Sequence, residues 1–124
     1  MLKIGIKHTE KLIISTKHTA KSIQSGGIDV LASPVLIGLM EKCAWKSVLS
    51  FMEQGYDTVG TSINMHHLYP SPINAKIHCE SKLIAVNNRE LVFQINAYHN
   101  DIKIAEATHN RFIINIDRFM KKVS

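Results

Sequence analysis

The stretch 32-ASPVLIGLMEKCAW-45 decides the fold, because it reads as the first half of one long and mostly apolar helix. Ser33 is a good N-cap and Pro34 suits the first helical position, so the helix is predicted from Ser33 to about Met52. The stripe expected to face the interior consists of Pro34, Gly38, Glu41, Trp45, Val48 and Met52. The stripe expected to face solvent consists of Lys42, Lys46, Ser50 and Glu53.

Glu41 is the unusual member of the inner stripe. A buried carboxylate is costly unless it is paired, hydrogen-bonded or neutralised. Two interpretations follow from the residues alone. Glu41 is either a reactive carboxylate or a structural one that pairs with a buried Arg or His. The pattern leaves both open.

Strand-like segments surround this helix. A short strand is predicted at residues 11–15, and a polar loop at residues 17–29 contains Gly26-Gly27. Four further strands are predicted at residues 57–66, 75–86, 90–98 and 102–116. Tight turns are expected at Asn87-Asn88 and at Asn100-Asp101, because Asn tolerates positive φ. One helix followed by consecutive antiparallel strands predicts an α+β architecture, with a sheet of four or five strands around the helix.

Alternation along these strands predicts which side chains share a face. In the first long strand, one face is predicted to carry Val59, Thr61, Ile63 and Met65. In the second, Ile77, Cys79 and Leu83 are predicted opposite Lys76, His78, Glu80 and Lys82. In the third, one face is predicted to carry Leu91, Phe93, Ile95 and Ala97.

Composition limits the class of protein. The 124 residues fit one domain, predicted to span residues 1–124. The net charge of +5 is diffuse and suits an anionic small ligand, but it lacks the clustered basic and aromatic residues of a nucleic-acid-binding surface. No run approaches the ~20 apolar residues of a membrane span, and the first residues do not resemble a signal peptide. A cytoplasmic protein without nucleic-acid or membrane partners is therefore expected.

Cysteine and histidine spacing argues against a metal site. Cys43 and Cys79 form no CxxC pair and are expected to be free thiols in the core. The spacing typical of metal ligands is also absent among the histidines at positions 66, 67, 78, 99 and 109. The chain also contains no GxSxG nucleophile motif and no glycine-rich phosphate loop.

Four segments carry a resemblance to a known family. They are VLIGLMEKCA, which Ala32-Ser33 precede, TVGTSINMHHLYPSP, VNNRELVFQINAYHNDIKIAEATHNRFII and DRFMKK, and the similarity extends from about residue 31 to residue 122. The chain resembles hotdog-fold acyl-CoA thioesterases and, more narrowly, the fluoroacetyl-CoA thioesterase family. This resemblance implies a sheet of about five antiparallel strands wrapped around a central helix. It also implies a homodimer or a higher assembly, with an acyl-CoA site at the subunit interface. No cofactor is expected, because coenzyme A is part of the substrate.

The same resemblance implies roles for six residues. The catalytic residues would be Ser33, Glu41 and His67, and the substrate-binding residues would be Gly60, Thr61 and Arg111. The family has threonine where this chain has Ser33, although the hydroxyl is kept. The family usually has glycine where this chain has Asn74, and Asn can also reach positive φ.

Each assignment has a structural alternative. Ser33 could serve only as an N-cap, and Arg111 could be part of an ion pair without a ligand. Only one of His66 and His67 can face inward if the strand continues there. A straight helix separates Ser33 from Glu41 by about 12 Å along its axis. The two can then share one substrate only from opposite ends of a bound group, with a bent helix start, or across a dimer.

The implied chemistry is transfer of an acyl group to water. Glu41 would attack the thioester or activate a water, and the sequence does not separate these two routes. The stretch SGGIDVLA at residues 25–32 lacks the bulky aromatic residue that fluoroacetyl-specialised members place before the helix. Ordinary short or medium acyl-CoAs are therefore the expected substrates. Two alternatives remain, a non-catalytic acyl-CoA-binding module and a hotdog dehydratase of 3-hydroxyacyl thioesters.

Overall fold

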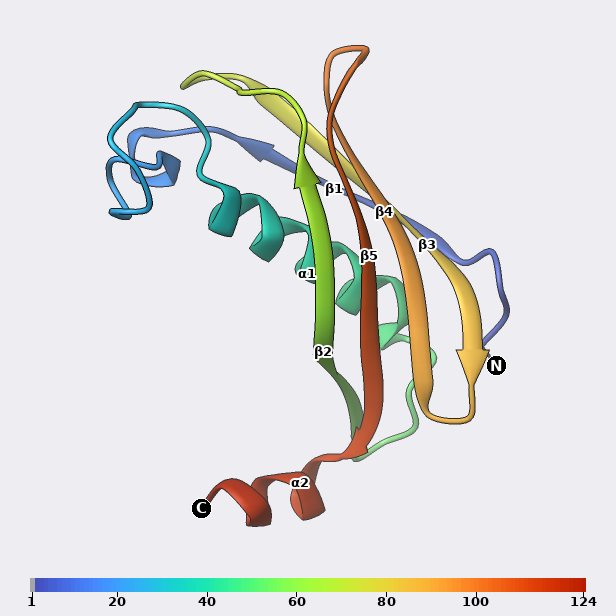
Figure 1. Cartoon of the computed structure of the whole chain (residues 1–124). Helices are drawn as coiled ribbons and strands as arrows, with labels where there is room; N and C mark the ends of the chain where they lie inside the picture. Colours follow the sequence, from blue (N-terminus) through green and yellow to red (C-terminus); the bar gives the residue numbers. More distant parts are fainter. Residues whose placement is uncertain (1) are drawn as a thin grey trace.

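A computed structural model describes residues 2–124, and it contains a five-stranded antiparallel sheet that curves around one helix (Figure 1). The strands are β1 (Lys7–Ile13), β2 (Tyr56–His67), β3 (Lys76–Asn87), β4 (Glu90–His99) and β5 (Ile102–Asn115). The helices are the 3₁₀ turn η1 (Thr16–His18), the central α1 (Ser33–Leu49) and the C-terminal α2 (Ile116–Val123). The order of strands is β1-β3-β4-β5-β2, so β1 and β2 form the two edges. The predicted α+β arrangement is confirmed.

The core lies between α1 and the concave face of the sheet. The helix contributes Leu36, Leu39, Met40, Cys43, Ala44 and Val48. The facing side chains of β3 and β4 are Ile77, Cys79, Leu83, Leu91, Phe93, Ile95 and Ala97. These strands alternate as predicted, because every second side chain must pack against the helix. Both cysteines are free and buried, also as predicted.

The inner face of α1 is rotated from the predicted one. Pro34 and Gly38 are exposed and Glu41 is half-buried, so their stripe lies at the border of the core. Ala32 is the N-cap and Ser33 is the first helical residue, which corrects the predicted N-cap by one position. The helix ends at Leu49 rather than near Met52.

The strand β1 starts four residues before the predicted segment. The prediction missed these residues because the inward-facing side chains at this end of the strand are polar. His8 Nε2 and a carboxylate oxygen of Glu10 lie 2.6 Å apart. The ammonium groups of Lys42 and Lys46 lie 3.6 and 3.9 Å from Glu10. These partners compensate the charge of Glu10 next to the helix, and they hold the pKa of that carboxyl below its ordinary value.

A β-bulge interrupts β2 between Gly60 and Ser62. Before the bulge, Val59 pairs with the exposed Phe112, so Val59 lies on the outer face of the sheet. After it, Ile63 and Met65 pack against the core. The prediction that Val59, Thr61, Ile63 and Met65 share one face is therefore wrong, because Thr61 is the extra residue of the bulge.

Turns and the C-terminus complete the fold. Asn88 and Asn100 have φ values of 58° and 56° at the two predicted hairpin turns, and Asn74 has a φ of 75°. The sequence reading did not include α2, which Asn115 caps by accepting a hydrogen bond from the backbone N–H of Arg118. Figure 1 shows α2 projecting from the end of β5. Among the described residues, neither α1 nor α2 has the length and hydrophobicity that a bilayer crossing requires.

Candidate active site

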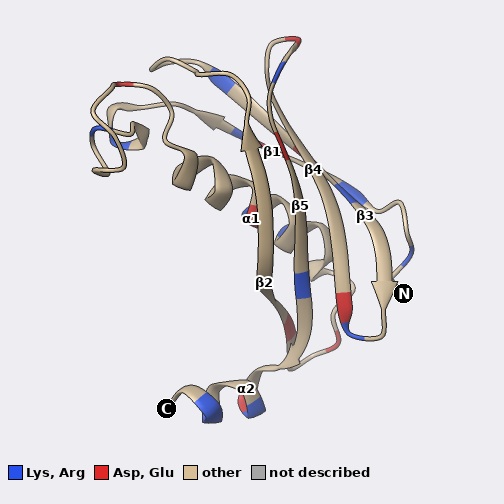
Figure 2. Ribbon diagram, viewed as in Figure 1, with Lys and Arg blue, Asp and Glu red and all other residues tan. Residues whose placement is uncertain are grey.

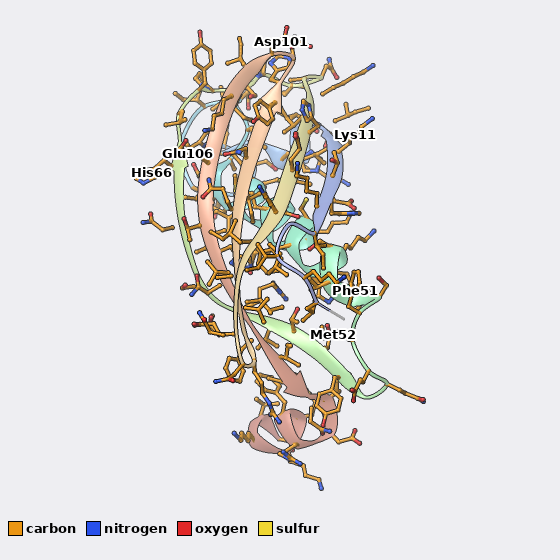
Figure 3. All side chains as sticks on the ribbon, turned by 90° about the vertical axis from the view of Figure 1, so that its right-hand side faces the viewer. Lys11, Phe51, Met52, His66, Asp101 and Glu106 are labelled. Atoms are coloured by element: carbon orange, nitrogen blue, oxygen red, sulfur yellow. The ribbon has the colours of Figure 1, made fainter. Side chains whose placement is uncertain are left out.

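Ser33 and His67 meet where α1 begins and β2 ends. The Ser33 hydroxyl oxygen lies 2.7 Å from His67 Nδ1, which is hydrogen-bond distance. Because Ala32 takes the N-cap position, the hydroxyl of Ser33 is available for this contact. The strand turns His67 inward and leaves His66 exposed. Figure 3 shows His66 on the side of β2 away from α1, near Glu106.

The second ring nitrogen of His67 is buried without a hydrogen-bond partner within residues 2–124. Burial lowers the pKa of His67, and the backbone at Tyr69 opposes this shift. The imidazole is therefore neutral at pH 7, because its ordinary pKa already lies below that value. A buried polar atom without a partner is costly, so Nε2 of His67 is a natural contact for a ligand.

A cavity of about 570 Å³ adjoins this pair. Its walls are Ala20, Ser25, Val30, Leu31, Ser33, Pro34, His67, Leu68, Tyr69 and Pro70. One wall is the loop before α1, which contributes small and aliphatic side chains. Tyr69, which follows β2, contributes an aromatic residue to the lining. The absence of an aromatic residue from 25–32 thus leaves this wall of the cavity without a ring.

Glu41 lies in a different place, beside the bulge of β2. A Cβ atom added to Gly60 would stand 2.9 Å from a carboxylate oxygen of Glu41, 3.2 Å from His109 Cε1 and 3.5 Å from Arg111 Nη1. Gly60 therefore leaves the space in which these three side chains converge. The negative charge of Glu41 acts to raise the pKa of both His109 and Arg111, although burial lowers each of them more.

Arg111 is buried on β5 and held by two neighbouring residues. Its Nε donates to the Thr58 hydroxyl and its Nη2 to the Thr58 carbonyl, both at 2.9 Å. Its Nη1 lies 3.2 Å from His109 Nε2. Among the described residues, Arg111 forms no ion pair with Glu41 within 4.0 Å, so the guanidinium is fixed by neutral acceptors.

The structure thus divides the six predicted residues into two groups and leaves one apart. Ser33 and His67 line the cavity, while Glu41, Gly60 and Arg111 lie together about two helical turns away. Thr61 belongs to neither group, because its exposed side chain donates to the Asn110 carbonyl at 3.2 Å. The sequence reading missed His109, which is completely buried. His109 and Arg111 are two positions apart in THNR, so in a strand they lie on the same face. This spacing could have indicated that His109 accompanies Arg111 in the site.

A model of the family described as FlK, fluoroacetyl-CoA-specific thioesterase, matches residues 14–117. The chain belongs to the fluoroacetyl-CoA-specific thioesterase family. It is accordingly a thioester hydrolase, as predicted. A relative in this family is the fluoroacetyl-CoA thioesterase of Streptantibioticus cattleyicolor, which is 23% identical over 98% of this chain and 92% of its own length.

Solved structures place the chain among hot-dog proteins. A threonine-to-serine mutant of FlK in complex with acetyl-CoA superposes with a TM-score of 0.93, at 23% identity, over 98% of this chain and 96% of its own. A hot-dog-like protein from Thermanaerovibrio acidaminovorans superposes with a TM-score of 0.91, at 16% identity, over 98% and 90% of the two chains. The predicted hotdog fold is confirmed.

Proposed function

We propose that this thioesterase hydrolyses short or medium acyl-CoA thioesters. The observation that carries the proposal is the Ser33–His67 hydrogen bond beside a cavity, with Nε2 of His67 buried and free of protein partners within residues 2–124. The cavity has the size of a small-ligand site. Membership of the fluoroacetyl-CoA-specific thioesterase family supports an acyl-CoA substrate, and so does the structural similarity to FlK in complex with acetyl-CoA.

The proposed reaction replaces the thioester C–S bond by a C–O bond from water. The carboxylate of Glu41 takes a proton from the attacking water or forms a transient anhydride that water then opens. Ser33 and His67 bind the thioester end. When Ser33 donates to Nδ1, the Nε2–H of the neutral His67 ring donates a hydrogen bond to the leaving sulfur, which departs as a thiolate and takes its proton from solvent. The positive N-terminal end of α1 favours the developing oxyanion.

We propose further that the two groups of residues combine across a homodimer. Ser33 and Glu41 are eight residues apart on one straight helix, or about 12 Å along the axis, which is too far to act on the same carbonyl. The exposed border of α1 and the free edge of β2 are surfaces that a second copy could cover. Lys and Arg are spread over the strands, the loops and α2, where they could meet the phosphates of coenzyme A (Figure 2).

Release of free thiol from a panel of acyl-CoAs tests the proposed function. The expected result is hydrolysis of at least one saturated short or medium acyl-CoA. Binding of acyl-CoA without thiol release would instead indicate a non-catalytic binding module. Water exchange between 3-hydroxyacyl-CoA and enoyl-CoA, without thiol release, would indicate a dehydratase.

The dimer is expected in light scattering at micromolar concentration, and complementation tests whether sites form across it. Glu41→Gln and His67→Ala each inactivate one half of the site. If the halves come from different subunits, a randomised mixture of the two variants regains about a quarter of wild-type activity, because half of the dimers contain one intact site. A stable monomer, or no regained activity in a proven heterodimer, would contradict this assembly.

Substrate preference provides a separate prediction. Because residues 25–32 place no aromatic ring over the cavity, fluoroacetyl-CoA is not expected to be strongly preferred over acetyl-CoA. The ratio of kcat/KM for the two substrates is expected to stay well below a thousandfold, which corresponds to about 4 kcal/mol of transition-state discrimination. Parallel thiol-release assays measure it, and a ratio of a thousandfold or more would refute the prediction.

A further inference from the structure

We propose that His109 is a positioning residue, which in its neutral form with the proton on Nδ1 holds the Arg111 guanidinium beside Glu41. This inference rests on the proposed role of Glu41 in thioester hydrolysis. His109 would not touch the substrate, and it would act through the side chain that it orients.

The hydrogen-bond partners of His109 define its tautomer. Nδ1 lies 2.8 Å from the Ser62 carbonyl oxygen, which can only accept, so Nδ1 must carry the proton. Nε2 lies 3.2 Å from Arg111 Nη1, which can only donate, so Nε2 must be the acceptor. The ring is completely buried, and it therefore links the bulge of β2 to the guanidinium in one fixed arrangement.

His109 contacts the guanidinium nitrogen of Arg111 that borders the space beside Gly60. Thr58 already holds Nε and Nη2 of the guanidinium. The remaining nitrogen, Nη1, converges with the Glu41 carboxylate on the space that Gly60 leaves free. An acceptor at Nε2 of His109 keeps Nη1 in that place. Its loss would allow the guanidinium to turn and would change the electrostatic field at Glu41.

Protonation of His109 would break this arrangement. A proton on Nε2 would oppose the N–H of Arg111 Nη1, so two donors would face each other. Burial and Arg111, on the same strand, lower the pKa of His109, whereas the Ser62 carbonyl and Glu41 of α1 raise it. The net shift is downward, so the ring is neutral at pH 7. The negative charge of Asp57 on β2 also favours the guanidinium cation.

Two substitutions separate the two hydrogen bonds of the ring. His109→Gln places an amide oxygen near the position of Nε2 and can still accept from Arg111. His109→Asn places an amide N–H near Nδ1, so it can donate to Ser62 but cannot reach Arg111. Turnover is expected to stay within about threefold for His109→Gln and to fall about tenfold or more for His109→Asn, with KM changed less, because a reacting group has been misplaced. The same substitutions at the exposed His66 are the matched controls and should leave turnover unchanged.

A pH profile and NMR supply readouts that a merely structural role would not change. On the acidic side of a plot of log(kcat/KM) against pH, the slope should fall by one in His109→Gln, because glutamine cannot be protonated in this pH range. Nitrogen-15 NMR of wild-type protein should show a protonated Nδ1 and an unprotonated Nε2 for His109. The Arg111 side-chain N–H groups should exchange slowly in wild type and in His109→Gln, and faster in His109→Asn.

The outcomes distinguish this proposal from the proposed function. An Nε2-protonated tautomer, or wild-type turnover and exchange in His109→Asn, would overturn the positioning role. A folded His109→Gln variant with tenfold lower turnover would also overturn it, even if His109→Asn fails to fold. Wild-type protein that has the expected NMR signature but releases no thiol from any acyl-CoA would overturn the proposed function and the catalytic purpose of His109, while supporting its placement of Arg111.

Discussion

Glu41→Gln is expected to lower turnover at least about 100-fold, which is the lower range for the loss of a general base. The substitution keeps the shape of the side chain and removes the charge that would attack the thioester or activate water. The KM for acyl-CoA should change little, because Ser33 and His67 are unaltered. Steady-state thiol release on the purified variant measures both parameters.

Stability is the control for this variant. Each guanidinium nitrogen of Arg111 has a partner in Thr58 or His109, so the neutral amide of the Glu41→Gln variant would leave no guanidinium nitrogen without an acceptor. The free energy of unfolding is therefore expected to change by about 1 kcal/mol or less, or roughly 5 °C in Tm. If Glu41 is instead the essential counter-charge of buried Arg111, its removal should cost about 3–5 kcal/mol. A destabilised variant with near-normal turnover per folded molecule would end the catalytic assignment.

Gly60→Ala is expected to lower turnover roughly 10- to 100-fold, the range for a reacting group displaced by about 1 Å. The added methyl group would stand 2.9 Å from a carboxylate oxygen of Glu41, which is too close for two non-bonded atoms. The end of the Glu41 side chain can move away, so the fold should survive with only a small change in Tm. Thiol-release kinetics and thermal unfolding on one sample test both parts.

A double-mutant cycle identifies the cause of this loss. If Gly60→Ala acts by moving the Glu41 carboxylate, it should have little further effect on turnover in the Glu41→Gln background. Equal losses in both backgrounds would mean that the methyl group acts elsewhere, for example on His109 or on the backbone of the bulge. Unchanged turnover in the single variant would show that the position of Glu41 does not limit the reaction.

Much of the fold could be predicted because β4, and β3 up to the register shift after Leu83, alternate clearly. Each alternates apolar and polar side chains over most of its length, and this period follows directly from the pleat of a half-buried strand. The strand β1 breaks the rule because His8 and Glu10 occupy inward positions, and only the approach of Lys42 and Lys46 makes that tolerable. These ion pairs join β1 to α1, which are far apart in the sequence, so no local sequence pattern predicts them.

The site could be predicted only in part from the residues. An out-of-place carboxylate identified Glu41, but the choice of His67 over His66 came from family resemblance, since the two differ by only one position in a strand. Contact between Ser33 and His67 depends on where α1 starts relative to the end of β2. Burial of Arg111 and His109 depends on the pairing of β5 with β2, which sequence periodicity does not specify.

The bulge in β2 has a consequence for how the site tolerates changes in chain length. Gly60 and His67 both face α1 although seven positions separate them, an odd number that a regular strand would send to opposite sides. Thr61 supplies the extra step that brings the two halves of the strand into the same phase. The presence of a residue at this position, whatever its side chain, sets the phase. Deleting this one residue would leave every predicted catalytic side chain in the sequence and still turn one half of the site toward solvent.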